Sequence, residues 1–127
     1  MNLIIDTDDR RPVYQQIADG IRTLIATGTL ANGQQLPSVR QVAADLGVNL
    51  NTVAAAYREL EEDGLITIKH GSGATVRPRI DVKHDIVELR APLRNALTHM
   101  VLSGLRRGEI LSMVHDELRG LLKGART

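Results

Sequence analysis

The chain contains no cysteine, no tryptophan and no phenylalanine, and only 2% of its 127 residues are aromatic. The absence of cysteine excludes disulfides and thiolate-ligated zinc, which fits a reducing cytoplasm. With so few aromatic side chains the core must be aliphatic, and stacking platforms for single-stranded nucleic acid are lacking. No apolar run approaches a membrane span, and the acidic start Asp6–Asp9 does not resemble a secretion signal. We therefore expect a cytoplasmic protein with no membrane partner.

The residues after Pro37 have the pattern of a helix with sharp ends. Pro37 disfavours helix in the residue before it. Ser38 and Gln41 then form a capping box, in which each side chain can satisfy the other residue's backbone N–H. Gly47 is expected to end the helix in the left-handed conformation. The prediction is a helix over Ser38–Leu46.

A second helix follows after a short turn. Asn49 is the expected cap of this helix, which is predicted over Asn51–Glu62. Three residues let the two helices approach closely. They are the small Ala43, the glycine Gly47 at the turn, and the β-branched Val53. We therefore expect a helix-turn-helix whose second helix presents its first turn to a DNA major groove.

A β-hairpin is predicted directly after the second helix. Gly64 ends that helix, and strands over Leu65–Ile68 and Ala74–Val76 flank a turn over residues 70–73. Because a single hairpin is marginal, it must pack apolar side chains against the helices. The expected packing residues are Leu65, Ile68 and Val76. This hairpin would be the wing of a winged helix-turn-helix.

The residues before the motif are expected to complete this domain. Pro12–Ala26 is predicted to be a helix that ends at Gly28. Leu3–Ile5 is predicted to be a short edge strand, and Leu30–Gln35 a loop. The apolar stripe of the helix comprises Val13, Ile17, Ile21, Leu24 and Ile25.

Two further helices are predicted after the wing. The first covers Ile86–Ser103, where Pro92 either kinks the helix or marks a start near Ala91. The second covers Arg107–Lys123. The expected fold is mainly α with a small β wing: a winged helix-turn-helix domain over residues 1–78 and a two-helix region over residues 79–127.

The two tail helices have apolar stripes that cannot enclose a core by themselves. They either fold back on the winged domain or form a symmetric bundle with a second chain, and we favour the homodimer. The predicted dimerisation residues are Leu93, Leu97, Met100, Val101, Ile110, Val114, Leu118, Leu121 and Leu122.

Seven short motifs occur in order along the chain. They are Pro12–Ile17, Gly28–Leu30, Leu36–Arg40, Asn51–Val53, Tyr57–Glu61, Gly64–Ile66 and Gly71–Gly73. Together they resemble the N-terminal domain of GntR-family bacterial transcription regulators, and the short helical tail resembles the YtrA subfamily. The resemblance implies a dimeric repressor that binds a palindromic operator in double-stranded DNA and controls neighbouring transporter genes.

Each candidate DNA contact has a structural alternative. The resemblance implies that Arg40 contacts DNA, and a solvated arginine is the alternative. Asn51 and Thr52 begin the second helix, but Asn51 could be a second capping residue. The resemblance places His70 and Gly71 at the minor groove or its phosphates, although His70 could be an ordinary turn residue. The full candidate set is Ser38, Arg40, Leu50, Asn51, Thr52, Arg58, Lys69, His70 and Gly71, with Ser38 expected to act as a cap.

The second helix departs from the family pattern. Several GntR members have arginines where this chain has Leu50 and Ala54, so those base contacts do not carry over. Both residues could touch thymine methyl groups instead. Arg58 lies one turn further on, and it either contacts DNA or forms a salt bridge to Asp63 or Glu62.

Net charge gives the DNA-binding interpretation little support. The formal net charge is +1, and residues 1–80 contain eight Lys and Arg against nine Asp and Glu. The alternative is a winged helix that docks on a partner protein without sequence-specific DNA binding. A steep fall of affinity with salt would separate the two, because groove binding releases counterions.

Enzyme sites are not indicated. His84, His99 and His115 lack convincing metal-ligand spacing, and Gly71–Gly73 is too short for a phosphate cradle. We expect no catalysis, no metal and no cofactor. A small-molecule effector in a dimer groove is conceivable, but no residue marks one.

Overall fold

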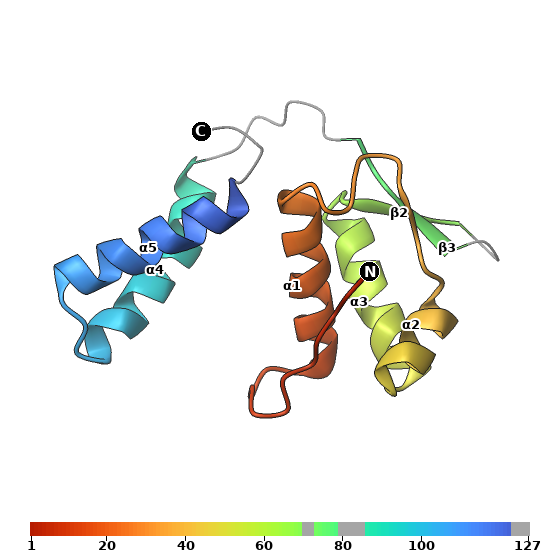
Figure 1. Cartoon of the computed structure of the whole chain (residues 1–127), viewed down its shortest axis with the longest axis horizontal. Helices are drawn as coiled ribbons and strands as arrows, with labels where there is room; N and C mark the ends of the chain where they lie inside the picture. Colours follow the sequence, from red (N-terminus) through yellow and green to blue (C-terminus); the bar gives the residue numbers. More distant parts are fainter. Residues whose placement is uncertain (70–72, 79–85, 123–127) are drawn as a thin grey trace. The chain divides into compact units, whose positions relative to one another are not determined.

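The computed structural model of the protein describes residues 1–69, 73–78 and 86–122, which belong to two compact units, Met1–Arg79 and Ile80–Thr127 (Figure 1). Over the described ranges, the first unit contains three helices and a small antiparallel sheet, and the second contains two helices. The expected fold class, mainly α with a small β wing, is confirmed.

The first unit closely follows the predicted order of elements. Its elements are α1 (Val13–Ala26), β1 (Gln35–Leu36), α2 (Val39–Leu46), α3 (Leu50–Glu62), β2 (Ile66–Lys69) and β3 (Gly73–Val76). β3 is the central strand and pairs antiparallel with both neighbours, so that Thr75 lies opposite Gln35 on one side and Thr67 on the other. The predicted helices and hairpin are confirmed to within one residue.

The core of this unit is aliphatic apart from one tyrosine. Its largest fully buried side chains are Tyr57, Ile17, Ile21, Leu60, Ile66, Val53 and Val76. They come from α1, α3, β2 and β3, so the helices and the sheet share one core. Each such aliphatic side chain contributes about 1.5–3 kcal/mol of stabilisation. The burial of Ile66 was not predicted from the sequence. The predicted packing residues Leu65 and Ile68 are only partly buried and pack against the core from outside.

The ends of the motif helices agree with the predictions in all but one detail. Ser38 Oγ accepts a hydrogen bond from the Gln41 N–H (3.1 Å), and Gly47 ends α2 with a φ of +67°. The reciprocal half of the capping box does not form. Instead, the Gln41 side chain donates to the Asp45 carboxylate (2.8 Å), because an acceptor one turn further along α2 is within its reach.

The third strand of the sheet lies where a loop was predicted. Gln35–Leu36 pairs with β3, and the two residues before it also form backbone hydrogen bonds with β3. The Gly33 N–H donates to the Val76 carbonyl (2.8 Å), and the Val76 N–H donates to the Gln34 carbonyl (2.9 Å). The loop prediction for Leu30–Gln35 is therefore wrong at its end, because a distant strand supplies the hydrogen-bond partners.

The predicted N-terminal edge strand, Leu3–Ile5, does not form. Side-chain contacts to α1 hold this segment instead. The Asp6 N–H donates to the buried Gln16 side chain (2.9 Å), whose amide donates back to the Asp6 carbonyl (3.2 Å). Leu3 lies against Gly20, where an added Cβ would come within 2.8 Å of the Leu3 Cδ2 atom. Leu3 and Ile5 pack their side chains against the core, so this segment is held in place without strand pairing.

The second unit consists of α4 (Ile86–Leu102) and α5 (Arg107–Leu121). Helix α4 runs through Pro92, so the alternative of a helix that starts near Ala91 is wrong. Proline removes the N–H that would donate to the Glu88 carbonyl, and both residues are exposed, so solvent can reach that carbonyl. The Glu109 carboxylate accepts from the Arg106 N–H (3.0 Å) at the start of α5.

Tyr57 connects the two helices of the motif. Its side chain is buried, and its hydroxyl donates to the Pro37 carbonyl (2.7 Å), directly before the Ser38 cap. Burial raises the pKa of the Tyr57 hydroxyl to about 12. In the sequence, Tyr57 is a tyrosine among the aliphatic residues of the buried stripe, and a buried tyrosine hydroxyl usually has a hydrogen-bond partner. The hydrogen bond ties the middle of α3 to the start of α2.

Removal of the Tyr57 hydroxyl tests this connection. Tyr57→Phe should lower the free energy of unfolding by about 1–2 kcal/mol, because the Pro37 carbonyl loses its donor. Tyr14→Phe is the matched control, and it should have little effect because Tyr14 is exposed. Chemical denaturation of both variants measures the difference, and equal stabilities would contradict the proposed role of the bond.

The same residue predicts a dependence on pH. Folding raises the Tyr57 pKa from 10.0 to about 12, so the neutral hydroxyl stabilises the fold fully below pH 10 and this contribution disappears as the pH rises through 12. Between these values the parent protein should lose more stability than Tyr57→Phe. Denaturation at a series of alkaline pH values checks the sign.

Candidate nucleic-acid interface

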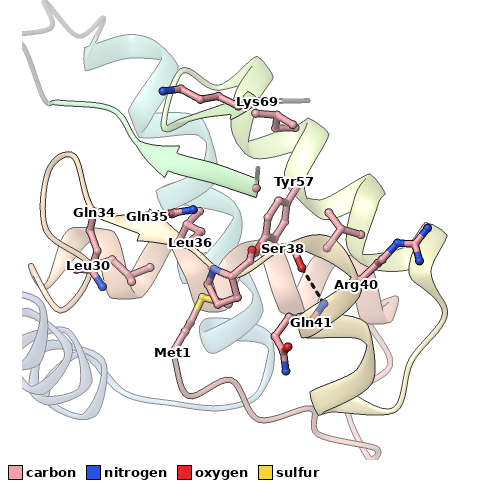
Figure 2. Close-up of a pocket in the computed structure, with 14 residues that line it drawn as sticks. Met1, Leu30, Gln34, Gln35, Leu36, Ser38, Arg40, Gln41, Tyr57 and Lys69 are labelled. Carbon is pink, nitrogen blue, oxygen red and sulfur yellow. Dashed lines mark hydrogen bonds between the residues drawn. The ribbon is translucent and has the colours of Figure 1, made fainter. Parts of the chain in front are cut away.

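Three of the predicted contact residues line one groove beside the start of α2. The groove has a volume of about 850 Å³, and its lining includes Ser38, Arg40 and Lys69 together with Tyr57 and the β1 residue Leu36. Figure 2 shows the Arg40 and Lys69 side chains pointing away from each other on either side of this lining. The motif and the wing therefore present cations on both sides of a surface that is partly apolar.

The other described candidates lie on α3, outside that groove. The inward residues of α3 are Val53, Ala56, Tyr57 and Leu60, and none is more than 1% exposed. Asn51 and Arg58 are exposed, and they are two turns apart on the opposite face. Leu50 is 43% exposed at the start of the helix, and Thr52 is partly buried. The helix thus separates a core face from an outward polar face.

The cap of α3 is Asn49, as predicted. Asn49 Oδ1 accepts from the Asn51 N–H (2.7 Å). The Asn51 side chain itself makes no hydrogen bond to any residue that the structure describes. The alternative that Asn51 is a second capping residue is therefore wrong, and its amide is available to a ligand.

Arg22 of α1 forms ion pairs with three acidic side chains. Its guanidinium contacts Glu59 on α3 (3.0 Å), Asp63 directly after that helix (2.5 Å), and Asp19 on its own helix (2.9 Å). Burial acts to lower the pKa of Arg22, but the hydrogen bonds with Asp63 and Glu59 outweigh it and raise the pKa above the ordinary arginine value. Three carboxylates are thereby neutralised on one side of the unit.

The basic candidates are not paired in this way. Within residues 1–69, 73–78 and 86–122, Arg40, Arg58 and Lys69 form no ion pair. The alternative salt bridge from Arg58 to Asp63 or Glu62 is wrong: Asp63 pairs with Arg22 of α1, and Glu62 forms no ion pair in the same ranges. Positive charge is therefore available on α2, α3 and β2, although the net charge of the chain is only +1.

Glu61 fastens the wing to α3. The Glu61 carboxylate accepts from the Ile68 N–H (2.7 Å) on β2, which is an edge strand of the sheet. Sequence reasoning missed this residue, because in the acidic run of α3 it resembles a solvated side chain. The predicted contacts His70 and Gly71 lie outside the described residues. The described base of the wing is nevertheless held in a defined position against the helix.

Other kinds of site find no support in the described residues. In those ranges no three His, Asp or Glu side chains gather as they would around a metal ion. None of the described helices is long and apolar enough to cross a membrane.

The model of the gntR family of bacterial regulatory proteins matches residues 13–76. The chain belongs to the GntR family. It is 30% identical to the HTH-type transcriptional repressor YtrA of Bacillus subtilis, over 91% of this chain and 88% of that protein. The resemblance to the GntR family and to YtrA is thus confirmed.

Two solved structures of transcription proteins are similar to this chain. YtrA from Sulfolobus acidocaldarius, a GntR-family transcription factor, aligns with a TM-score of 0.63 and 38% identity over 76% of this chain and 97% of that one. A transcriptional antiterminator from Listeria monocytogenes aligns over 100% of this chain and 97% of that one, with a TM-score of 0.86 and 28% identity. The protein is a GntR transcription regulator with a winged-helix DNA-binding domain, and it is not an enzyme.

Loss of the Glu61 contact should loosen the base of the wing. Glu61→Ala removes the acceptor of the Ile68 N–H, so this amide should exchange its hydrogen with solvent at least several-fold faster. Glu61→Gln keeps a carbonyl acceptor at the same place and should retain most of the protection. Hydrogen exchange followed by NMR measures both. If the Ile68 amide were equally protected in Glu61→Ala, the carboxylate would not hold the wing.

Proposed function

We propose that this GntR protein is a cytoplasmic repressor that binds a palindromic operator as a homodimer and controls neighbouring transporter genes. Repression is supported by the similarity to the repressor YtrA over most of both chains. Control of transporter genes is what the subfamily resemblance implies. A repressor with two identical DNA-binding units requires an operator with matching two-fold symmetry.

The observation that carries DNA binding is the separation of charge in the winged unit. Arg40, Arg58 and Lys69 are exposed and unpaired within the described residues, whereas acids on α3 are bound to Arg22. Cations on α2 and β2 suit phosphates, which position a protein on the duplex. The outward face of α3, which carries Asn51, suits base edges in the major groove. The winged unit thus supplies both kinds of contact.

The tail supplies the surface for dimerisation. Five of the predicted residues are partly buried: Leu97, Met100, Ile110, Val114 and Leu121. The other four are exposed: Leu93, Val101, Leu118 and Leu122, at 53%, 61%, 47% and 40%. No described residue of α4 or α5 is fully buried. An apolar surface of this kind on a small helical unit is typical of a protein interface.

Arg40→Ala tests the phosphate assignment. We expect weaker binding by a similar factor to the operator and to unrelated duplexes, and a shallower dependence of affinity on salt. Arg10→Ala, at an exposed arginine in the loop before α1, is the control for the loss of one charge. Fluorescence titrations at several salt concentrations measure both. Loss confined to one base pair would contradict a phosphate contact, and affinity that is independent of salt would favour docking on a protein instead.

Leu118→Asp tests the dimer. If Leu118 lies against a second chain, the new carboxylate is buried without a partner and should cost several kcal/mol of association. The monomer should bind a palindrome roughly 10²-fold more weakly, because two linked binding units gain from each other. Ser112→Asp adds the same charge at an exposed polar position of α5 and is the control. Sedimentation and titration on full and half operators measure both effects. A Leu118→Asp protein that remains dimeric would contradict the proposed interface.

A further inference from the structure

The outward face of α3 carries a polar side chain at each end and small apolar side chains between them. Asn51, Ala55 and Arg58 recur at helical spacing on the side opposite the core, and Ala54 lies beside them. Between the amide of Asn51 and the guanidinium of Arg58, this face therefore carries only methyl groups. Side chains this small allow the helix to approach a partner surface closely.

The two polar ends of this face are free to bind. The Asn51 side chain has no hydrogen-bond partner, and Arg58 has no ion pair, among the described residues. Two of the neighbouring acids are engaged elsewhere, since Glu59 pairs with Arg22 and Glu61 accepts from the wing. Glu62, one turn after Arg58, forms no ion pair with it in the described part of the chain, so the Arg58 guanidinium is unpaired there.

The dimensions of the face match a short stretch of duplex. Asn51 and Arg58 are seven positions apart, which corresponds to about 10 Å of helix. That length spans about three base-pair steps. Asparagine pairs with adenine and arginine with guanine in the major groove, while an alanine methyl group makes apolar contact with the 5-methyl group of thymine.

We propose that α3 reads a half-site in which thymine methyl groups pack against Ala54 and Ala55, between an adenine read by Asn51 and a guanine read by Arg58. The proposal rests on the proposed function, DNA binding by this helix, and adds the base chemistry of the operator. The two alanines are specificity-determining residues, and at Ala54 the apolar contact takes the place of an arginine found in other GntR members.

Base analogues test the methyl contact without altering the protein. Duplexes that bind the full chain are first selected from a random library. Each thymine of the selected site is then replaced by uracil, which lacks only the 5-methyl group. At one or two thymines per half-site the dissociation constant should rise about fourfold, the effect expected for one methyl group withdrawn from an apolar contact.

Variants then assign the contact to the alanines. In Ala54→Gly and Ala55→Gly the uracil effect should vanish at the thymine that each residue touches. Ala44→Gly, at an exposed position of α2, carries a similar helix-propensity cost and should keep the full effect. Asn51→Ala and Arg58→Ala should relax the preference for the adenine and the guanine, respectively, roughly tenfold each.

The outcomes separate the two proposals. If no sequence is enriched, both the proposed function and this readout are wrong. If a site is enriched but uracil changes nothing at any thymine, the function stands and the methyl readout is overturned. If the uracil effect persists unchanged in both glycine variants, the thymines are read by residues other than Ala54 and Ala55.

Discussion

The hydrogen bond from Tyr57 to the Pro37 carbonyl is the constraint on which the DNA-binding surface depends. Helix α2 is short, and only Val42 and Ala43 in it are buried, so apolar packing alone orients it weakly. A directional bond at its start removes that freedom, since a buried hydroxyl that loses its partner is costly. The positions of Ser38 and Arg40 relative to α3 follow from it. Burial of Tyr57 thus connects the stability of the core with the geometry of the interface.

The local distribution of charge, and not the net charge, suits this protein to binding a polyanion such as DNA. The winged unit has one more acid than bases, yet Arg22 of α1 pairs with Asp19, Glu59 and Asp63. At physiological salt the Debye length is about 8 Å, so a duplex senses mainly the charges at the contact itself. Free cations on α2, α3 and β2 can therefore act although the whole chain is almost neutral. The same pairing that stabilises α1 against α3 keeps Arg58 available.

The two units differ in how they obtain their stability. The winged unit has its own core, whereas the described tail helices bury no residue completely. Isolated helices of this length are marginal in water, so most of their stability must come from packing. Association with a second chain would provide that packing, and it would also set the spacing of the two reading helices. In this proposal one apolar surface serves both folding of the tail and recognition of the operator.

The sequence by itself determined the local structure of this protein. Caps such as Ser38 and Asn49, the left-handed Gly47 and the helical apolar stripes act within a few residues, so their effects can be predicted from neighbours alone. The candidate contacts on α2 and α3 followed from these helices and from family motifs. Only the tertiary structure decided the strand at Gln35–Leu36, because its hydrogen bonds come from a strand far along the chain. The partners of Asp63 and Glu61, and hence the freedom of Arg58 and the attachment of the wing, likewise depended on elements that meet only after folding.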